Sequence, residues 1–444
     1  MKSNRLVTFA LLGIFIGIHF ALPSHRYIVR SDGAQQSESQ REQPTNTPAF
    51  VERGIYDTDP HHLWNRLYRS LFIRIASDGQ EYGYDELDPL LWSDTKRLLS
   101  GPSHQQAIHL LDEFLSANAE QLIADPLKRA FLQHDLWAVF DWSTQRPDEP
   151  SPQKRELQIR LAQIIRRLAL PKEQIEKLPN NYADAVASKA FAGSYDPDRP
   201  QVTFLPSDLF QPEGPWAPLS VIGGEPVAPG HVSNFSGRSA FRVFMRLPGG
   251  RQATLAYIKK LLDFPHPWIQ HPQDYDRMLP NPDLPQFPVG TQLALVRQMI
   301  LIDNQGDLAP TNLTEQVQIR VHRAIPSKIL EVVRVDLNEA KTSLDVSEFK
   351  LSRERFLLGK SGGLRAVTPD EREFPLFQSK GIDPFESSSE RGSPGRQILS
   401  SCAHCHFRPG IHSVLSRERR RLTAAWDIKY EASNAVSWKH SRYD

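Results

Sequence analysis

Cysteine is nearly absent from this chain, because its 444 residues include only Cys402 and Cys405. Two cysteines cannot build the disulfide framework that stabilises small secreted domains, so the fold has to rest on a hydrophobic core. Net charge is also nearly absent, since 53 Lys and Arg residues oppose 52 Asp and Glu residues, for a formal charge of +1. No overall field therefore attracts nucleic acid or anionic lipid, and we expect no nucleic-acid partner.

Long hydrophobic runs are missing everywhere except at the amino terminus. A mean hydropathy of -0.45, with 39% hydrophobic residues, excludes a polytopic membrane protein and also a wholly disordered chain. Proline is abundant by contrast, with 35 residues, which favours long, turn-rich connections over idealised helices. The length suits two or three domains.

The apolar run at the amino terminus, residues 6–22, follows Lys2 and Arg5. A basic start before an apolar stretch is typical of an export signal, and the run also reaches the minimum length of a bilayer-spanning helix. Residues 1–22 are therefore predicted to be a signal peptide or an N-terminal membrane anchor, with a buried core helix as the third interpretation. The bulky His19, at position −3 of the nearest cleavage site, favours retention. We expect the protein on the periplasmic side of a bacterial cytoplasmic membrane, anchored or soluble.

The rest of the chain divides by composition and by periodicity. Residues 23–50 are polar and contain proline, as a disordered tether does. Apolar residues recur at helical spacing over 51–192 and alternate over 193–380, which predicts a helical domain and an antiparallel β-rich domain. Residues 381–412 contain both cysteines, and 413–444 form a basic tail. The predicted fold class is α+β.

Several individual elements can be placed from local signals. A helix is expected to begin at Asp125-Pro126, as an N-cap followed by a proline in the first turn, and others are expected over 154–170 and 253–264. Leu293, Leu295, Arg297, Met299 and Leu301 would share one face of a strand. Alternation resumes at Val317 after the loop 304–312, which predicts a hairpin with a long connection.

The two cysteines lie three positions apart and immediately precede a histidine, in the sequence Cys402-Ala403-His404-Cys405-His406. This C-x-x-C-H spacing is that of covalent c-type haem attachment. Two thiols one helical turn apart can reach the two vinyl groups on one edge of the porphyrin, and the next imidazole can then reach the iron. Cys402 and Cys405 are thus the predicted attachment residues, and His406 is the predicted proximal ligand of the haem iron.

The surrounding segment resembles the haem-binding helix of class I cytochromes c. Residues 395–399, Gly-Arg-Gln-Ile-Leu, precede the cysteines, and Pro409-Gly410 closes the stretch. The resemblance covers residues 395–410 only, and the remainder resembles no family of known activity. It implies one haem c on a short C-terminal attachment segment within residues 381–412.

The segment departs from that family in the second axial ligand of the iron. None of the 38 residues after His406 is a methionine, although class I cytochromes c carry a methionine ligand downstream of the motif. The upstream candidates are Met299, which we rank first, and Met245. A methionine on an alternating strand more often fills a core, and His412 lies too close in sequence to reach the opposite haem face easily. A five-coordinate iron is the remaining alternative.

Two other interpretations of the motif stay open. Cys402, Cys405, His406 and His412 have ligand types and spacing acceptable for zinc. The cysteines alone could also form a disulfide, although the βαβ context of a thioredoxin-like motif is not visible. Their position directly before His406 and the predicted export favour haem.

Three functions follow from these alternatives. The first is an exported haem protein that transfers electrons to or from a redox partner protein, with a possible membrane contact through the N-terminal segment. The second is a haem enzyme, or a sensor of peroxide or a diatomic gas, with an open sixth coordination site. The third is a non-catalytic envelope protein in which the Cys/His motif holds zinc or a disulfide.

Overall fold

A computed structural model of the chain describes the larger part of residues 54–420. The described residues are 54–76, 79–85, 88–144, 151–219, 221–222, 225–226, 238–325, 343–368, 383–386, 410–415 and 419–420. The predicted signal or anchor at 1–22, the predicted tether at 23–50 and the motif at 402–406 lie outside them. All described residues belong to one compact unit, Glu52–Asp444.

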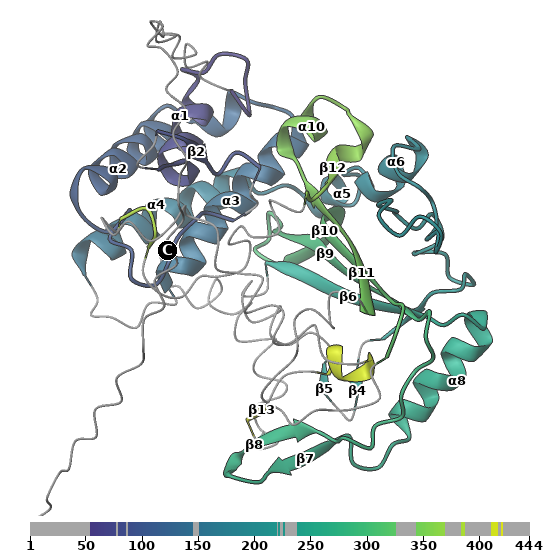
Figure 1. Cartoon of the computed structure of the whole chain (residues 1–444). Coiled ribbons are helices and arrows are strands. Elements are labelled where there is room, and N and C mark those ends of the chain that lie inside the picture. The colour runs from purple at the N-terminus through teal and green to yellow at the C-terminus, as the bar shows by residue number, and fades with distance from the viewer. Residues whose placement is uncertain are drawn as a thin grey trace, which may run out of the picture. The chain divides into compact units, whose positions relative to one another are not determined.

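Helices make up the first part of the described chain (Figure 1). They are α1 (Leu63–Phe72), α2 (Gly101–Ser116), α3 (Pro126–Thr144), α4 (Pro152–Leu168), α5 (Lys172–Ile175) and α6 (Asn181–Ala187), with the 3-10 helix η1 (Ala119–Gln121). Helix α3 begins as predicted, because the Asp125 carboxylate accepts a hydrogen bond from the backbone N–H of Leu127. The predicted helix at 154–170 is α4, whose N-cap hydroxyl on Ser151 accepts from the N–H of Lys154.

A six-stranded antiparallel sheet follows, with strand order β12-β11-β10-β9-β6-β3. Its strands are β3 (Ala217–Pro218), β6 (Ser239–Arg246), β9 (Gln292–Ile302), β10 (Leu308–His322), β11 (Leu344–Leu351) and β12 (Leu364–Ala366). The hairpin predicted around the 304–312 loop is β9–β10, and its connection is shorter than expected because β10 already begins at Leu308. Gly306 makes the tight turn, with φ of 85°. Together with the helices, this sheet confirms the α+β class.

Smaller elements complete the fold. The predicted helix at 253–264 is α8 (Gly250–Leu262). The others are β1 (Arg74–Ile75), β2 (Glu81–Tyr82), β4 (Val221–Ile222), β5 (Glu225–Pro226), β7 (Trp268–His271), β8 (Asp274–Pro280), β13 (Arg419–Arg420), α10 (Arg353–Leu357), η2 (Ser361–Gly363) and η4 (Gly410–Ser413).

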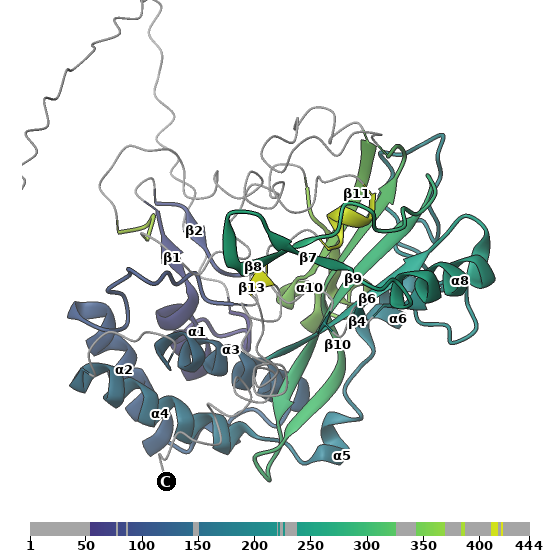
Figure 2. The ribbon, with the colours of Figure 1, turned by 90° about the horizontal axis from the view of Figure 1, so that it is seen from below.

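Helices cover the large sheet on both faces, with α3 on one face and α6 on the other (Figures 1 and 2). On one face, α3 packs against β9, where the Gln133 amide donates to the carbonyl of Ile302 at 2.8 Å. On the other face, Phe210 contacts Phe244 with ring centroids 5.4 Å apart, and α6 packs on β10. An apolar sheet face has to be covered by another layer, and here the helices cover it. Residues of the helices and of the sheet therefore belong to one large hydrophobic core.

A second, smaller core lies at the other end of the face that α3 covers. Met245 of β6 and Leu293 of β9 are paired across the strands there, and α8 contributes Leu261. Ile411 and Leu415, from far downstream in the sequence, complete this second core. It is the part of the fold that lies nearest in sequence to the predicted haem motif.

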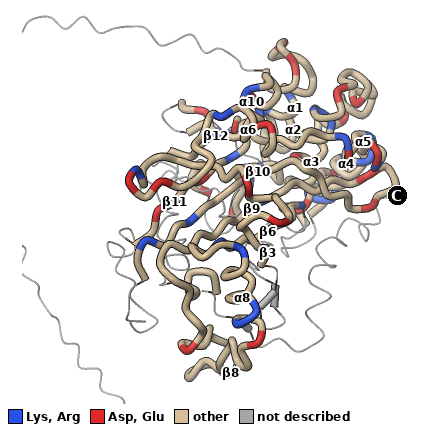
Figure 3. The backbone as a smooth tube through the Cα atoms, turned by 90° about the vertical axis from the view of Figure 1, so that its right-hand side faces the viewer, with Lys and Arg blue, Asp and Glu red and all other residues tan. Residues whose placement is uncertain are grey.

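Charge is spread evenly over the backbone. In the view of Figure 3, Lys and Arg positions are interspersed with Asp and Glu positions. This distribution agrees with the formal charge of +1 and offers no one-signed face in that view.

Candidate functional site

The predicted haem-attachment residues Cys402, Cys405 and His406 lie outside the described residues. The structure does describe a short segment on each side of them. The upstream contact segment is residues 383–386, and the downstream contact segment is residues 410–415. Both segments pack against the folded body, on different elements.

In the upstream contact segment, two side chains hold the chain against the helical region. The Asp383 carboxylate pairs with the guanidinium of Arg74 at 2.7 Å, and both side chains are almost wholly buried. The Phe385 ring lies under the same guanidinium, 4.6 Å from its carbon to the ring centroid. An ion pair combined with a cation–π contact fixes this part of the chain beside β1.

Glu386 makes a third contact, with the loop before α2. Its carboxylate accepts hydrogen bonds from the Thr95 hydroxyl at 2.6 Å, from the Lys96 N–H at 3.0 Å and from the Arg97 N–H at 2.9 Å. Partial burial acts to raise the pKa of Glu386, but these donors outweigh it and hold the pKa below its ordinary value. The ionised Glu386 carboxylate is therefore bound by the donors of the loop before α2.

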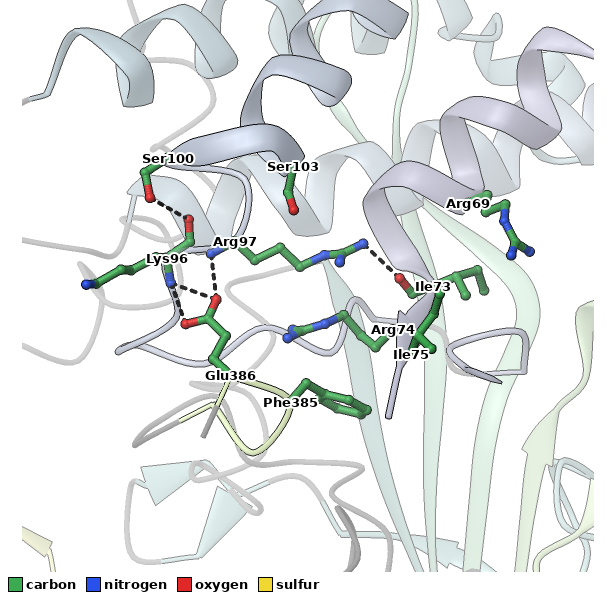
Figure 4. Close-up of a pocket in the computed structure, with 10 residues that line it drawn as sticks. All are labelled: Arg69, Ile73, Arg74, Ile75, Lys96, Arg97, Ser100, Ser103, Phe385 and Glu386. Carbon is green, nitrogen blue, oxygen red and sulfur yellow. Dashed lines mark hydrogen bonds between the residues drawn. The ribbon is translucent and has the colours of Figure 1, made fainter. Parts of the chain in front are cut away.

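These contacts border a cavity of about 420 Å³ between α1, the loop before α2 and the upstream contact segment (Figure 4). Its lining is mainly basic and small: Arg69, Ile73, Arg74, Ile75, Lys96, Arg97, Ser100, Ser103, Phe385 and Glu386. Three of the cations are already engaged: Arg69 with Glu81, Arg74 with Asp383, and Arg97 with the carbonyls of Ser70 and Ile73. Carboxylates therefore neutralise Arg69 and Arg74, whereas Arg97 donates to uncharged carbonyl oxygens.

The downstream contact segment seats the chain on the second core. The backbone N–H of Ile411 donates to Gln286 Oε1 at 2.7 Å, and Arg320 donates to the carbonyl of Ser413 at 3.2 Å. Gly410 adopts φ of 53°, and a Cβ there would lie 1.9 Å from Gln286 Oε1. A residue with a side chain therefore cannot replace Gly410 without displacing Gln286. Figure 1 shows this turn, in yellow, beside the lower end of the sheet.

A buried histidine lies in the wall of the second core. His322, the last residue of β10, is 1% exposed, and its ring centroid is 4.7 Å from that of Phe287. Its Nε2 is buried without a hydrogen-bond partner in the part of the chain that the structure describes. Such an unpaired polar atom costs about 1–3 kcal/mol. Burial, aided by the charge of Arg320, lowers the pKa of His322 to about 3, so the imidazole is neutral near pH 7.

The two methionines considered from the sequence lie in different cores. Met245 is fully buried in the second core, together with Ile411. Met299 is 1% exposed in the large core that α3 covers. Gln292, at the end of β9 beside the downstream contact segment, is seven positions from Met299, which corresponds to ~23 Å along a strand. Coordination by Met299 stays a prediction.

One group of residues was not anticipated from the sequence: a buried ionic network between α3 and the sheet. Arg297 lies between Asp88 at 3.0 Å and Glu315 at 3.3 Å, and Arg238 pairs with Asp88 and, at 2.9 Å, with Asp141. His134 Nε2 is 3.5 Å from Glu315, and both side chains are fully buried. Burial lowers the pKa of His134, against the attraction of Glu315.

This network ties α3 to the sheet, and its central side chains, Arg297 and Glu315, are buried. The available signal was the set of ionisable residues within the mostly apolar stretch 130–142 of α3, namely His134, Asp135 and Asp141. In a sequence, each of these is indistinguishable from a residue on an exposed helix face. Only the structure shows that residues 130–143 of the helix are buried on every side.

Among the described residues, no group of three or more His, Cys, Asp or Glu side chains is arranged to bind a metal ion. Nor does any helix in the described ranges have both the length and the hydropathy to cross a bilayer. Neither finding bears on residues 1–22 or on Cys402, Cys405 and His406. Comparison of the chain with protein-family models, with curated proteins and with solved structures gave no match.

Proposed function

We propose that the protein is an exported, single-haem c-type protein that transfers electrons to or from a redox partner protein. Cys402 and Cys405 would hold the porphyrin through thioethers, and His406 would bind the iron. The observation that carries the proposal is the C-x-x-C-H motif itself, because two cysteines placed at random would rarely show this spacing directly before a histidine.

The surroundings of the motif support this function. The motif lies between two segments that pack against the body, so it is bounded on both sides by fixed chain. Gly410 follows His406 by four positions, and four residues span at most ~14 Å. A haem carried by His406 would therefore stay close to the second core. An apolar wall beside a haem suits electron transfer, because excluding water limits reorganisation around the iron and tunes its potential.

The predicted location agrees with the proposed chemistry. The basic start and apolar run at residues 1–22 support export, which would place the C-x-x-C-H motif on the periplasmic side of a bacterial membrane. If the run is retained, it would keep the haem protein beside membrane-bound redox partners.

The proposal is tested by expressing the full chain in a bacterium that has a cytochrome c maturation system. We expect a haem stain that survives denaturing electrophoresis and a c-type pyridine haemochrome spectrum with one haem per chain. The double substitution Cys402→Ala/Cys405→Ala should abolish the stain, and Ser400→Ala/Ser401→Ala serves as the matched control. A stain that persists in the double cysteine variant, or no stain in the wild type, would refute covalent attachment.

The electron-transfer role has its own test. The purified haem protein should be reduced and reoxidised reversibly by one electron, and it should not form a CO adduct on mixing. Rapid CO binding would favour the alternative of a haem enzyme or gas sensor with an open sixth site.

A further inference from the structure

We propose that the cavity beside Arg97 binds a small organic carboxylate, with its charged group at the Arg97 guanidinium and its apolar body against Ile73 and Ile75. The lining residues are all described by the structure, and none belongs to the C-x-x-C-H motif. The inference is therefore independent of the proposed haem. The volume of about 420 Å³ is in the range of pockets that hold small organic molecules.

The Arg97 guanidinium has no carboxylate partner among the described residues. Its Nη2 donates to the carbonyls of Ser70 and Ile73, at 2.8 and 2.7 Å, which holds the guanidinium at the carboxyl end of α1. Its Nε is buried without a hydrogen-bond partner in the same part of the chain. Burying an unpaired donor is unfavourable, and a carboxylate oxygen of a ligand would satisfy it.

The charges around the cavity favour an anion. Arg69 and Arg74 are each paired with a carboxylate, so they contribute little net charge. Arg97 and Lys96 then oppose the carboxylate of Glu386, which leaves one positive charge in excess among the lining residues. Burial, followed by repulsion from Arg74, lowers the pKa of Arg97 to about 10, against the attraction of nearby carboxylates. A bound carboxylate would stabilise the charged guanidinium.

Helix α2 adds a second attraction for an anion. Ser100, its N-cap residue, and Ser103, in its first turn, both line the cavity (Figure 4). The first backbone N–H groups of a helix have no partner within the helix, and the helix dipole places partial positive charge there. The first turn of α2 contains no acidic residue that would neutralise this charge.

The apolar lining favours an organic anion over an inorganic one. Ile75 is 57% exposed although it is a large apolar side chain, and Ile73 and Phe385 also border the cavity. An apolar chain on the ligand would cover Ile75 and release water from it. One excess positive charge matches a single carboxylate better than a phosphate group, which carries about two negative charges at pH 7.

The test is isothermal titration calorimetry of the purified full-length protein at pH 7 and low salt, with sodium octanoate as the probe. We expect one saturable site, and we expect acetate and octan-1-ol to bind at least about tenfold more weakly, because each lacks one half of the ligand. Arg97→Met should weaken octanoate binding at least about tenfold. Lys96→Met is the matched control and should weaken it less than about threefold, because the exposed Lys96 side chain points away from the Arg97 guanidinium (Figure 4).

Ser103→Glu is a second variant, which leaves Arg97 in place and decides the question if Arg97→Met does not accumulate. Glutamate is favourable in the first turn of a helix, so the fold should be kept, whereas the new carboxylate would compete with the ligand. Ser103→Gln has nearly the same size without the charge, and it should bind octanoate at least about fivefold more tightly than Ser103→Glu.

Three results would overturn the assignment. The first is the absence of saturable octanoate binding in the wild type. The second is an octanoate affinity that is unchanged in Arg97→Met or in Ser103→Glu. The third is sulfate or inorganic phosphate that binds as tightly as octanoate, because the site would then be one for inorganic anions.

Discussion

Arg74 and Asp383 form a buried ion pair at 2.7 Å although 309 positions separate them in the sequence. The pair joins the first strand of the helical region to the chain that leads towards the predicted haem motif. Because the pair is buried, water solvates neither charge, and each charge is stabilised mainly by the other.

Removing one member of this pair should therefore be costly. We expect Asp383→Ala to lower the free energy of unfolding by about 3–5 kcal/mol, because it leaves the Arg74 guanidinium buried without its carboxylate. Urea denaturation followed by circular dichroism measures the change. The double variant Arg74→Met/Asp383→Leu should recover much of the loss, and an Asp383→Ala protein as stable as the wild type would contradict the prediction.

The conformation of Gly410 gives a second prediction. Gly410→Ala should destabilise the protein by about 1–3 kcal/mol, because φ of 53° strains alanine and the new Cβ displaces Gln286 from its hydrogen bond with Ile411. The matched control is Gly306→Ala, which has φ of 85° but no atom within 4 Å of the added Cβ. Gly306→Ala should lower the free energy of unfolding only by the cost of the strained backbone. Equal losses in thermal unfolding would show that the contact with Gln286 contributes nothing.

The upstream contact segment should respond to acid through Glu386. Because the pKa of Glu386 is lower in the folded protein than its ordinary value of 4.5, the folded state binds the proton less readily than the unfolded state. Its stabilisation is present above pH 4.5 and is lost as the pH falls through the folded pKa. Limited proteolysis at residues 383–386 should accelerate in that window. Glu386→Gln should be cleaved faster at pH 7 and lose this pH dependence, and a wild-type profile in the variant would exclude the carboxylate as the cause.

The buried network predicts a contrast between two arginines. Arg297→Met leaves the fully buried Glu315 without its guanidinium, so we expect a loss of about 3–5 kcal/mol in the free energy of unfolding. Arg66→Met removes a contact that is even shorter, with Glu113 at 2.7 Å, but both side chains are about one-third exposed. Its loss should stay within about 1 kcal/mol. Similar values for the two variants in chemical denaturation would be inconsistent with a role for burial.

The sequence allowed the fold class and several elements to be predicted, because the period of apolar residues is a local property. The start of α3 at Pro126 and the β9–β10 hairpin are examples. Strand order could not be predicted in the same way, since periodicity does not say that β6 pairs with β9 across the inserted helix α8. Contacts such as Arg74–Asp383 depend on that tertiary arrangement.

The burial of His322 could only be found in the structure. In the sequence, Val317, Ile319 and Val321 mark the apolar face of a strand, which assigns His322 to the opposite face. The opposite face of an antiparallel strand is commonly solvated, so a histidine there attracts no attention. The structure shows instead that the downstream contact segment, α8 and Phe287 cover it.

The packing of Gly410 against Gln286 also sets the local concentration, near the second core, of any group carried by His406. Because only three residues separate the fixed Gly410 from His406, any group on His406 would be confined to a small volume, which corresponds to an effective concentration in the millimolar range or above. A side chain in the second core therefore needs only weak intrinsic affinity to stay bound to that group. An external ligand would have to exceed the same local concentration before it could compete.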